Sequence, residues 1–114
     1  MSHEQKDLIS YDVFQKMDIR IGTIIAVEEI PKAKKLWKLT VKFSEDESRT
    51  ILAGIKKNYD ADSLLKTQIA VLTNLEPRKM FGEESQGMLL AADVDNEAIL
   101  LRPDKLVPEG SNVR

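Results

Sequence analysis

The chain contains no cysteine, and all of its apolar runs are short. Without cysteine, neither a disulfide nor a thiolate metal site can form. A membrane-spanning helix needs roughly 20 apolar residues in succession, and no run approaches that length. The polar start from Met1 to Asp7 also lacks the form of a signal peptide. These absences predict a soluble, cytoplasmic protein with no membrane partner.

The residues that most enzymes use are also scarce. The only histidine is His3, close to the N-terminus. The sequence has no phosphate-binding loop, no dinucleotide fingerprint and no metal-ligand spacing. Its acid pairs, Glu83-Glu84 and Asp93 with Asp95, are typical of solvated turns. The sequence therefore predicts no enzyme activity, no catalytic residue, no metal and no cofactor.

The positive charges are concentrated although the net charge is −2. The 114 residues are 42% apolar and 32% charged, which indicates a single globular domain. At physiological salt the Debye length is about 8 Å, so a ligand responds to a local patch more than to the total charge. Either a cationic binding surface or ordinary solvated lysines would account for the pattern. The basic clusters are Lys32, Lys34, Lys35, Lys38 and Lys42, with no acid among them, and the pairs Lys56-Lys57 and Arg78-Lys79.

Hydrophobic periodicity predicts a chain built mainly of strands. Ser10 is expected to cap a short helix over residues 11–17. In the long strand that follows, Gly22 indicates a sharp bend or a close backbone approach. The two-residue period of that strand places on one face Ile19, Ile21, Thr23, Ile25 and Val27. In the second strand it places on one face Trp37, Leu39, Val41 and Phe43, so Trp37 is expected in the core rather than stacked on a base.

The remaining elements are shorter. A third strand is expected over residues 50–55, and a single helical turn around Leu64-Leu65, capped by Asp62 or Ser63. Further strands are expected over residues 69–75, 88–92 and 98–101, with turns at 95–96 and 108–110 and an irregular tail over 103–114.

This order of elements predicts an all-β fold. The predicted architecture is a five-stranded Greek-key barrel of the OB type, with a short N-terminal helix and a one-turn helix between strands three and four. An open sandwich is the alternative. Residues 10–114 are expected to form the domain, and residues 1–9 a flexible N-terminus.

The connection from Asn74 to Met88 is far longer than the two to five or so residues that a hairpin requires. It carries an adjacent Arg-Lys pair, an exposed Met-Phe, two glycines and a serine. A loop with cations, a hydroxyl and soft apolar groups on a rigid strand pair indicates recognition.

Several segments resemble the tRNA-binding domain family, which includes stand-alone tRNA-binding proteins and modules of methionyl-tRNA synthetases. These are residues 18–24 (DIRIGTI), 31–41 (PKAKKLWKLTV), 74–88 (NLEPRKMFGEESQGM), 100–103 (LLRP) and 107–110 (VPEG). Two positions depart from the family pattern. Lys34 replaces a frequent acid, which makes the first loop more basic, and Ala53 replaces a frequent serine, which removes a hydroxyl.

The resemblance implies an OB fold that binds the outer corner of tRNA by its shape, with little reading of sequence. Lysines would contact phosphates, Arg78 would grip one bidentately, Ser85 would donate to a phosphate or 2′-oxygen, and Met80 or Met88 would pack on a sugar or base. Asn74 is expected either to contact RNA or to hold the loop in shape. Met88 is expected either to contact RNA or to be an ordinary core residue of its strand. Gly82 and Gly87 are expected to shape the loop. The predicted RNA-binding residues are Lys32, Lys34, Lys35, Lys38, Asn74, Arg78, Lys79, Met80, Ser85 and Met88.

The expected function is non-catalytic tRNA binding in trans, which assists aminoacylation or supplies a separate subunit of a methionyl-tRNA synthetase. The alternative is a chaperone-like peptide-binding protein of the same family. A homodimer is also expected, because two barrels present a wider surface to an L-shaped RNA. The candidate interface residues are Leu8, Ile9, Leu106, Val107 and Val113.

Overall fold

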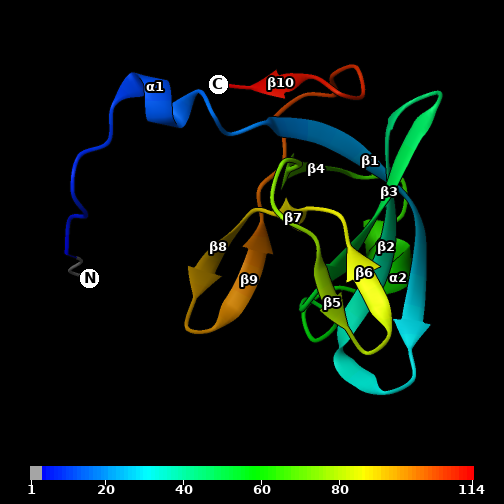
Figure 1. Cartoon of the computed structure of the whole chain (residues 1–114). Helices are drawn as coiled ribbons and strands as arrows, with labels where there is room; N and C mark the ends of the chain where they lie inside the picture. The colour runs from blue at the N-terminus through cyan, green and yellow to red at the C-terminus, as the bar shows by residue number, and fades with distance from the viewer. Residues whose placement is uncertain (1–3) are drawn as a thin grey trace.

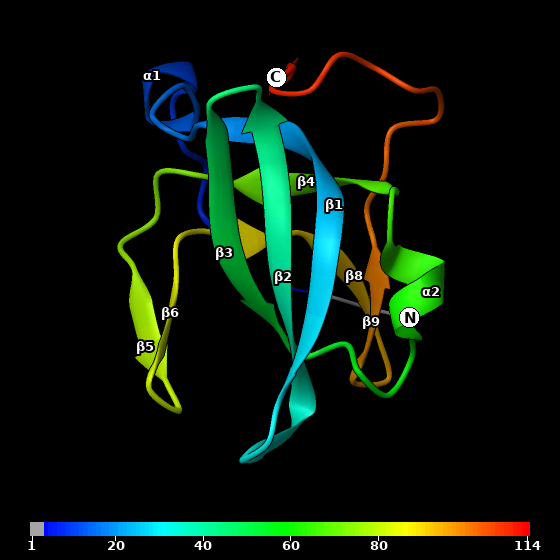
Figure 2. The same ribbon diagram turned by 90° about the vertical axis from the view of Figure 1, so that its right-hand side faces the viewer.

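A long bent strand, β1 (Ile19–Ile30), is the centre of the fold in the computed structural model, which describes residues 4–114. The first part of β1 pairs antiparallel with β4 (Gln68–Leu72), and the part from Thr23 onward pairs with β2 (Ala33–Ser44). Beyond β2 lies β3 (Glu47–Ala53), and beyond β4 lies β7 (Met88–Leu89). The sheet order is therefore β3-β2-β1-β4-β7, and Figure 2 shows β3, β2 and β1 side by side.

The free edge of β3 is joined to the segment that precedes β7. The Gln86 amide donates to the Thr50 carbonyl at 2.8 Å, and the Thr50 amide donates to Gln86 Oε1 at 2.9 Å. These bonds bring the two ends of the curled sheet together. The nearly all-β, curled antiparallel architecture confirms the predicted fold class.

The predicted close approach at Gly22 is confirmed, and a bulge after Ile24 interrupts the predicted two-residue period of β1. A Cβ atom on Gly22 would lie 2.4 Å from Val41 Cγ1. Ile24 is fully buried, while Ile25 is 47% exposed. The register with β2 shifts between Ile24 and Ala26, so that Val27, three residues after Ile24, packs against the same main hydrophobic cluster.

The core side of β2 follows the predicted alternation. Trp37, Leu39, Val41 and Phe43 are all buried in the main hydrophobic cluster. Trp37 Nε1 donates to the Tyr59 carbonyl at 2.8 Å, so the polar atom of the buried indole has a partner. Trp37 is a core residue, as expected.

Both predicted helices are present, and the first is shorter than expected. In α1 (Tyr11–Phe14) the Ser10 hydroxyl accepts from the Val13 amide at 3.2 Å, which confirms the cap. Figure 1 shows α1 and the segment before it standing away from the sheet, beside β10 (Asn112–Val113), which pairs with the start of β1. The N-cap of α2 (Ala61–Leu64) is Asp60 rather than Asp62 or Ser63.

Two hairpins project from the sheet. The connection predicted to be a loop contains β5 (Arg78–Met80) and β6 (Glu83–Ser85), which the sequence analysis missed. The strand predicted over residues 98–101 is present as β9 (Glu97–Leu100), and it pairs with β8 (Ala91–Val94) in a sheet separate from the main one. The turns at 95–96 and 108–110 are confirmed by positive φ at Asp95, Asn96 and Gly110. Within residues 4–114, no helix has the length and apolar content to cross a membrane.

Candidate nucleic-acid interface

The β5–β6 hairpin places its side chains on two different faces. Arg78 pairs with Ser85, Lys79 with Glu84, and Met80 with Glu83. Because directly paired residues share a face and successive residues alternate, Arg78 and Met80 lie on one face and Lys79 on the other. The structure therefore separates Lys79 from Arg78, although the two were predicted to act together.

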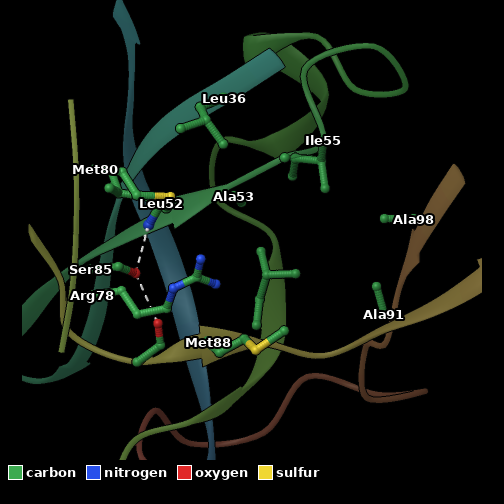
Figure 3. Close-up of a pocket in the computed structure, with 13 residues that line it drawn as sticks. Leu36, Leu52, Ala53, Ile55, Arg78, Met80, Ser85, Met88, Ala91 and Ala98 are labelled. Atoms are coloured by element: carbon green, nitrogen blue, oxygen red, sulfur yellow. Dashed lines mark hydrogen bonds between the residues drawn. The ribbon is translucent and has the colours of Figure 1, made fainter. Parts of the chain in front are cut away.

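One pocket of about 350 Å³ brings together four of the predicted residues, namely Arg78, Met80, Ser85 and Met88 (Figure 3). Among the residues that the structure describes, Arg78 is the only charged one in its lining. The remaining wall comes from β2, β3 and the β8–β9 hairpin, and its apolar side chains include Leu36, Leu52, Ala53, Ile55, Ala91 and Ala98. A flat apolar group with a negative charge beside it would fit such a site.

A second hollow, of about 460 Å³, lies between the β1–β2 turn and the tip of the β5–β6 hairpin. Three predicted lysines, Lys32, Lys34 and Lys35, line it together with Ala33 and Phe81. Leu36 and Met80 line both hollows, so the two adjoin. Met80 also packs against a small buried cluster formed by Ile30, Ala33 and Leu52, which anchors the hairpin on the sheet.

The ion pairs divide the basic residues into two groups. Lys38 Nζ lies 3.0 Å from Glu83 Oε1, and this hydrogen bond and the charge of Glu83 raise the pKa of Lys38. Lys42 is also paired, with Glu45 at 3.4 Å and Glu109 at 3.8 Å. Across the described part of the chain, none of the remaining predicted cations lies within 4.0 Å of a carboxylate; these are Lys32, Lys34, Lys35, Arg78 and Lys79.

Ser85 is buried, and its hydroxyl is already bonded within the protein. It accepts from the Leu52 amide at 3.0 Å and donates to the Gly87 carbonyl at 2.9 Å. The serine therefore holds β6 against β3. Contact with RNA remains a prediction for Ser85, and also for Met88, whose side chain is 52% exposed at the pocket.

Asn74 lies apart from both hollows and secures the start of β1. Its Oδ1 accepts from the Asp18 amide at 2.8 Å, and its Nδ2 donates to the Lys16 carbonyl at 2.6 Å. The amide thus joins the end of β4 to the segment between α1 and β1. It supports that distant segment and not the loop that it was expected to hold.

Phe81 and Leu36 are candidate site residues that the sequence analysis did not select. Phe81 is 56% exposed at the hairpin tip, beside the three lysines. The sequence offered only a weak signal, Gly82 in the second position of the turn, because phenylalanine is not a residue that such turns prefer. His3 lies outside the described residues. In the described range, no group of three or more His, Cys, Asp or Glu residues is placed to hold a metal ion.

Residues 19–112 match the family described as "Putative tRNA binding domain". The chain belongs to this tRNA-binding domain family. The resemblance noted in the sequence is therefore confirmed, and it covers nearly the whole sheet. The family is described as a binding domain and not as a catalytic domain.

Relatives of this tRNA-binding domain include much longer proteins. Methionine–tRNA ligase of Methanococcoides burtonii is 51% identical over 107 residues, which are 93% of this chain and 16% of the relative. Methionine–tRNA ligase of Pyrococcus furiosus is 46% identical over 112 residues, which are 97% of this chain and 15% of the relative. The chain thus corresponds to a small part of each ligase.

Solved structures of similar size share the fold. A protein from Pyrococcus horikoshii described as MetRS-related has a TM-score of 0.88 and 35% identity, and the match covers 96% of this chain and 100% of that one. Chaperone CsaA from Bacillus anthracis has a TM-score of 0.85 and 27% identity, covering 95% of this chain and 100% of that one.

Proposed function

We propose that this tRNA-binding domain acts in trans as a non-catalytic, shape-directed tRNA-binding protein. It assists aminoacylation or serves as a separate subunit of a methionyl-tRNA synthetase. The methionine–tRNA ligases that contain a similar segment support the link to that enzyme. A cytoplasmic location is part of the proposal, because the ligand and the enzyme meet there.

The observation that carries the proposal is the set of unpaired cations around two adjoining hollows. Lys32, Lys34 and Lys35 line one hollow and Arg78 lines the other. Folded RNA offers phosphates, 2′-hydroxyls and a few unstacked bases, because its deep major groove is closed to side chains. Lysines suit single phosphate contacts, and the guanidinium of Arg78 suits a bidentate one.

Substitution of these cations tests the proposal. Lys34→Ala combined with Lys35→Ala should weaken binding of unfractionated tRNA and reduce the salt slope of log K by about 2, roughly 1 for each lost phosphate contact. The matched control combines Lys16→Ala with Lys105→Ala, two exposed lysines that line neither hollow. Equal losses in the two double variants would contradict a localised interface.

Action in trans has its own test. The chain is added to a methionyl-tRNA synthetase from which the corresponding segment has been removed, and the KM for tRNA is measured. The proposal expects a lower KM with the chain and no charging of tRNA by the chain alone. An unchanged KM at saturating chain would contradict the assisting role.

A homodimer is part of this proposal, supported by exposed apolar groups near both termini. Leu8 is 90% exposed, Leu106 87% and Ile9 63%. The short α1 has no buried residue, and a helix of that length depends on packing for stability. Val107 and Val113 line an apolar hollow of about 560 Å³ that a second copy would cover.

Size-exclusion chromatography with light scattering tests the dimer. Leu8→Asp combined with Ile9→Asp should yield a monomer, while the control Leu65→Asp, a partly exposed leucine beside α2, should not. A wild-type protein that is monomeric at all concentrations would disprove this part of the proposal.

Chaperone-like peptide binding is the second candidate, supported by the similar CsaA structures and by the apolar pocket. The retained Arg-Lys-Met and Ser-Gln-Gly-Met segments favour RNA. Suppression of aggregation of an unfolded protein, with no measurable tRNA binding, would favour the chaperone role instead.

A further inference from the structure

Phe81 occupies a backbone position that does not suit it. Phe81 and Gly82 form the two-residue turn of the β5–β6 hairpin, with φ of +53° and +79°. Such turns strongly prefer Asn, Asp or Gly, because bulky side chains rarely adopt positive φ. The other projecting hairpin follows this preference, with Asp95 and Asn96 at φ of +51° and +69°. Turn chemistry therefore does not account for a phenylalanine at this tip.

The phenylalanine is held at a fixed place rather than on a free loop. Met80, the preceding residue, packs on the small buried cluster beneath the hairpin. Glu83, which directly follows the turn, is bonded to Lys38 of β2 at 3.0 Å. These contacts fix both sides of the turn, so the ring of Phe81 remains exposed at the edge of the second hollow.

The composition of this hollow matches a nucleotide. Its apolar side chains are Ala33, Leu36, Met80 and Phe81, and lysines are the only charged side chains that the described residues contribute to it. An unstacked base offers a flat apolar ring for an aromatic side chain, and its flanking phosphates offer negative charge. An apolar peptide would bring nothing to balance Lys32, Lys34 and Lys35, which have no ion pair within the described residues.

We propose that this hollow captures a single unstacked nucleotide of the bound RNA. The base stacks on Phe81, and the neighbouring phosphates contact Lys32 of the β1–β2 turn and Lys34 and Lys35 at the start of β2. The inference rests on the proposed tRNA-binding function and adds a stacking position to it. It gives Phe81 a role in binding, which accounts for a phenylalanine at a turn position where positive φ disfavours it.

Phe81→Asn separates this role from folding. Asn is favoured at positive φ, so the midpoint of urea unfolding should stay the same or rise. The affinity for unfractionated tRNA should nevertheless fall about 5- to 150-fold, as expected for the loss of one base stacked on an aromatic ring. Phe81→Tyr, which keeps the ring, should retain affinity close to wild type.

Phe81→Trp gives a direct readout of stacking. The native indole of Trp37 is buried and supplies a constant background, whereas the introduced indole is exposed at the hollow. Titration with unfractionated tRNA should quench the added fluorescence, and titration with an unfolded peptide should not.

Three results would overturn the inference. If Phe81→Asn binds tRNA as tightly as wild type while the Lys34/Lys35 double variant loses affinity, the stacking site is wrong and the proposed function stands. If the introduced indole responds to peptide and not to tRNA, the hollow belongs to a peptide. If the wild-type protein does not bind tRNA, the inference falls together with the proposed function.

Discussion

Ser85 and Asn74 both direct their side-chain polar atoms to the protein's own backbone, at places far apart in the fold. Ser85 bridges β6 to β3, and Asn74 bridges the end of β4 to the start of β1. Their types and positions in the sequence were equally compatible with RNA contact. Only the distances to Leu52, Gly87, Lys16 and Asp18 reveal the internal partners.

Ser85→Ala should therefore act first on stability. The change leaves the Leu52 amide and the Gly87 carbonyl without the hydroxyl, which should lower the free energy of unfolding by about 1–3 kcal/mol. Urea denaturation measures the difference, and Ser48→Ala, an exposed serine of β3, is the matched control. A Ser85→Ala variant of unchanged stability that binds tRNA more weakly would instead support direct contact with RNA.

At the scale of elements, regular patterns were predicted well and irregular ones were not. The strict alternation of β2 identified its buried face, and Ser10 identified the start of α1. The bulge after Ile24 interrupted the two-residue period of β1, so that Ile24 before it and Val27 after it contact the same main cluster although they lie three residues apart. The β5–β6 hairpin was missed because Phe81 is not a residue that its turn prefers.

The same limit applies to the candidate site. Sequence clustering correctly indicated many lysines near the β1–β2 turn, but charge pairing depends on positions in space. Glu83 of β6 is far from Lys38 of β2 in sequence, yet the two form an ion pair of 3.0 Å between the hairpin and the sheet. Lys79 adjoins Arg78 in sequence and lies on the opposite face. Within residues 4–114, the cations around the hollows that have no carboxylate partner are therefore Lys32, Lys34, Lys35 and Arg78.

The ion pair between Lys38 of β2 and Glu83 of β6 leads to a prediction about how the β5–β6 hairpin affects tRNA binding. Glu83→Gln releases Lys38, so tRNA binding should strengthen and its salt slope should steepen by about 1. Glu84→Gln removes the same charge from the neighbouring position, which faces away from the sheet. The two variants are compared by fluorescence anisotropy over a salt series. Equal affinities of the two variants for tRNA would show that the ion pair with Glu83 does not keep Lys38 from contacting RNA.

The pKa of Lys38 supplies a second readout for this pair. Glu83 raises it above the ordinary value of 10.5, so Glu83→Gln should lower it toward that value in an NMR titration. The raised pKa also sets the sign of the pH dependence. Stabilisation by the pair is fully present below pH 10.5 and is lost as the pH rises through the raised pKa.

At the scale of the whole molecule, the charge is unevenly distributed around the pocket. One wall carries Arg78 on the β5–β6 hairpin, with Lys32, Lys34 and Lys35 beyond it. The other wall is the β8–β9 hairpin, whose tip carries Asp93, Asp95 and Glu97. A net charge of −2 is thus compatible with binding of an anionic ligand. The acids of the β8–β9 hairpin repel the ligand and so orient it toward the cationic wall.

Shape-directed binding of tRNA is the central claim, and a salt series with three RNAs tests it most directly. Unfractionated tRNA, a plain RNA duplex and single-stranded RNA are compared by gel shift with the wild-type protein. With about four phosphates contacted, log K for tRNA should fall against log salt with a slope near −3, and tRNA should bind more tightly than the other two at every salt concentration. Equal affinity for all three RNAs would contradict shape-directed recognition.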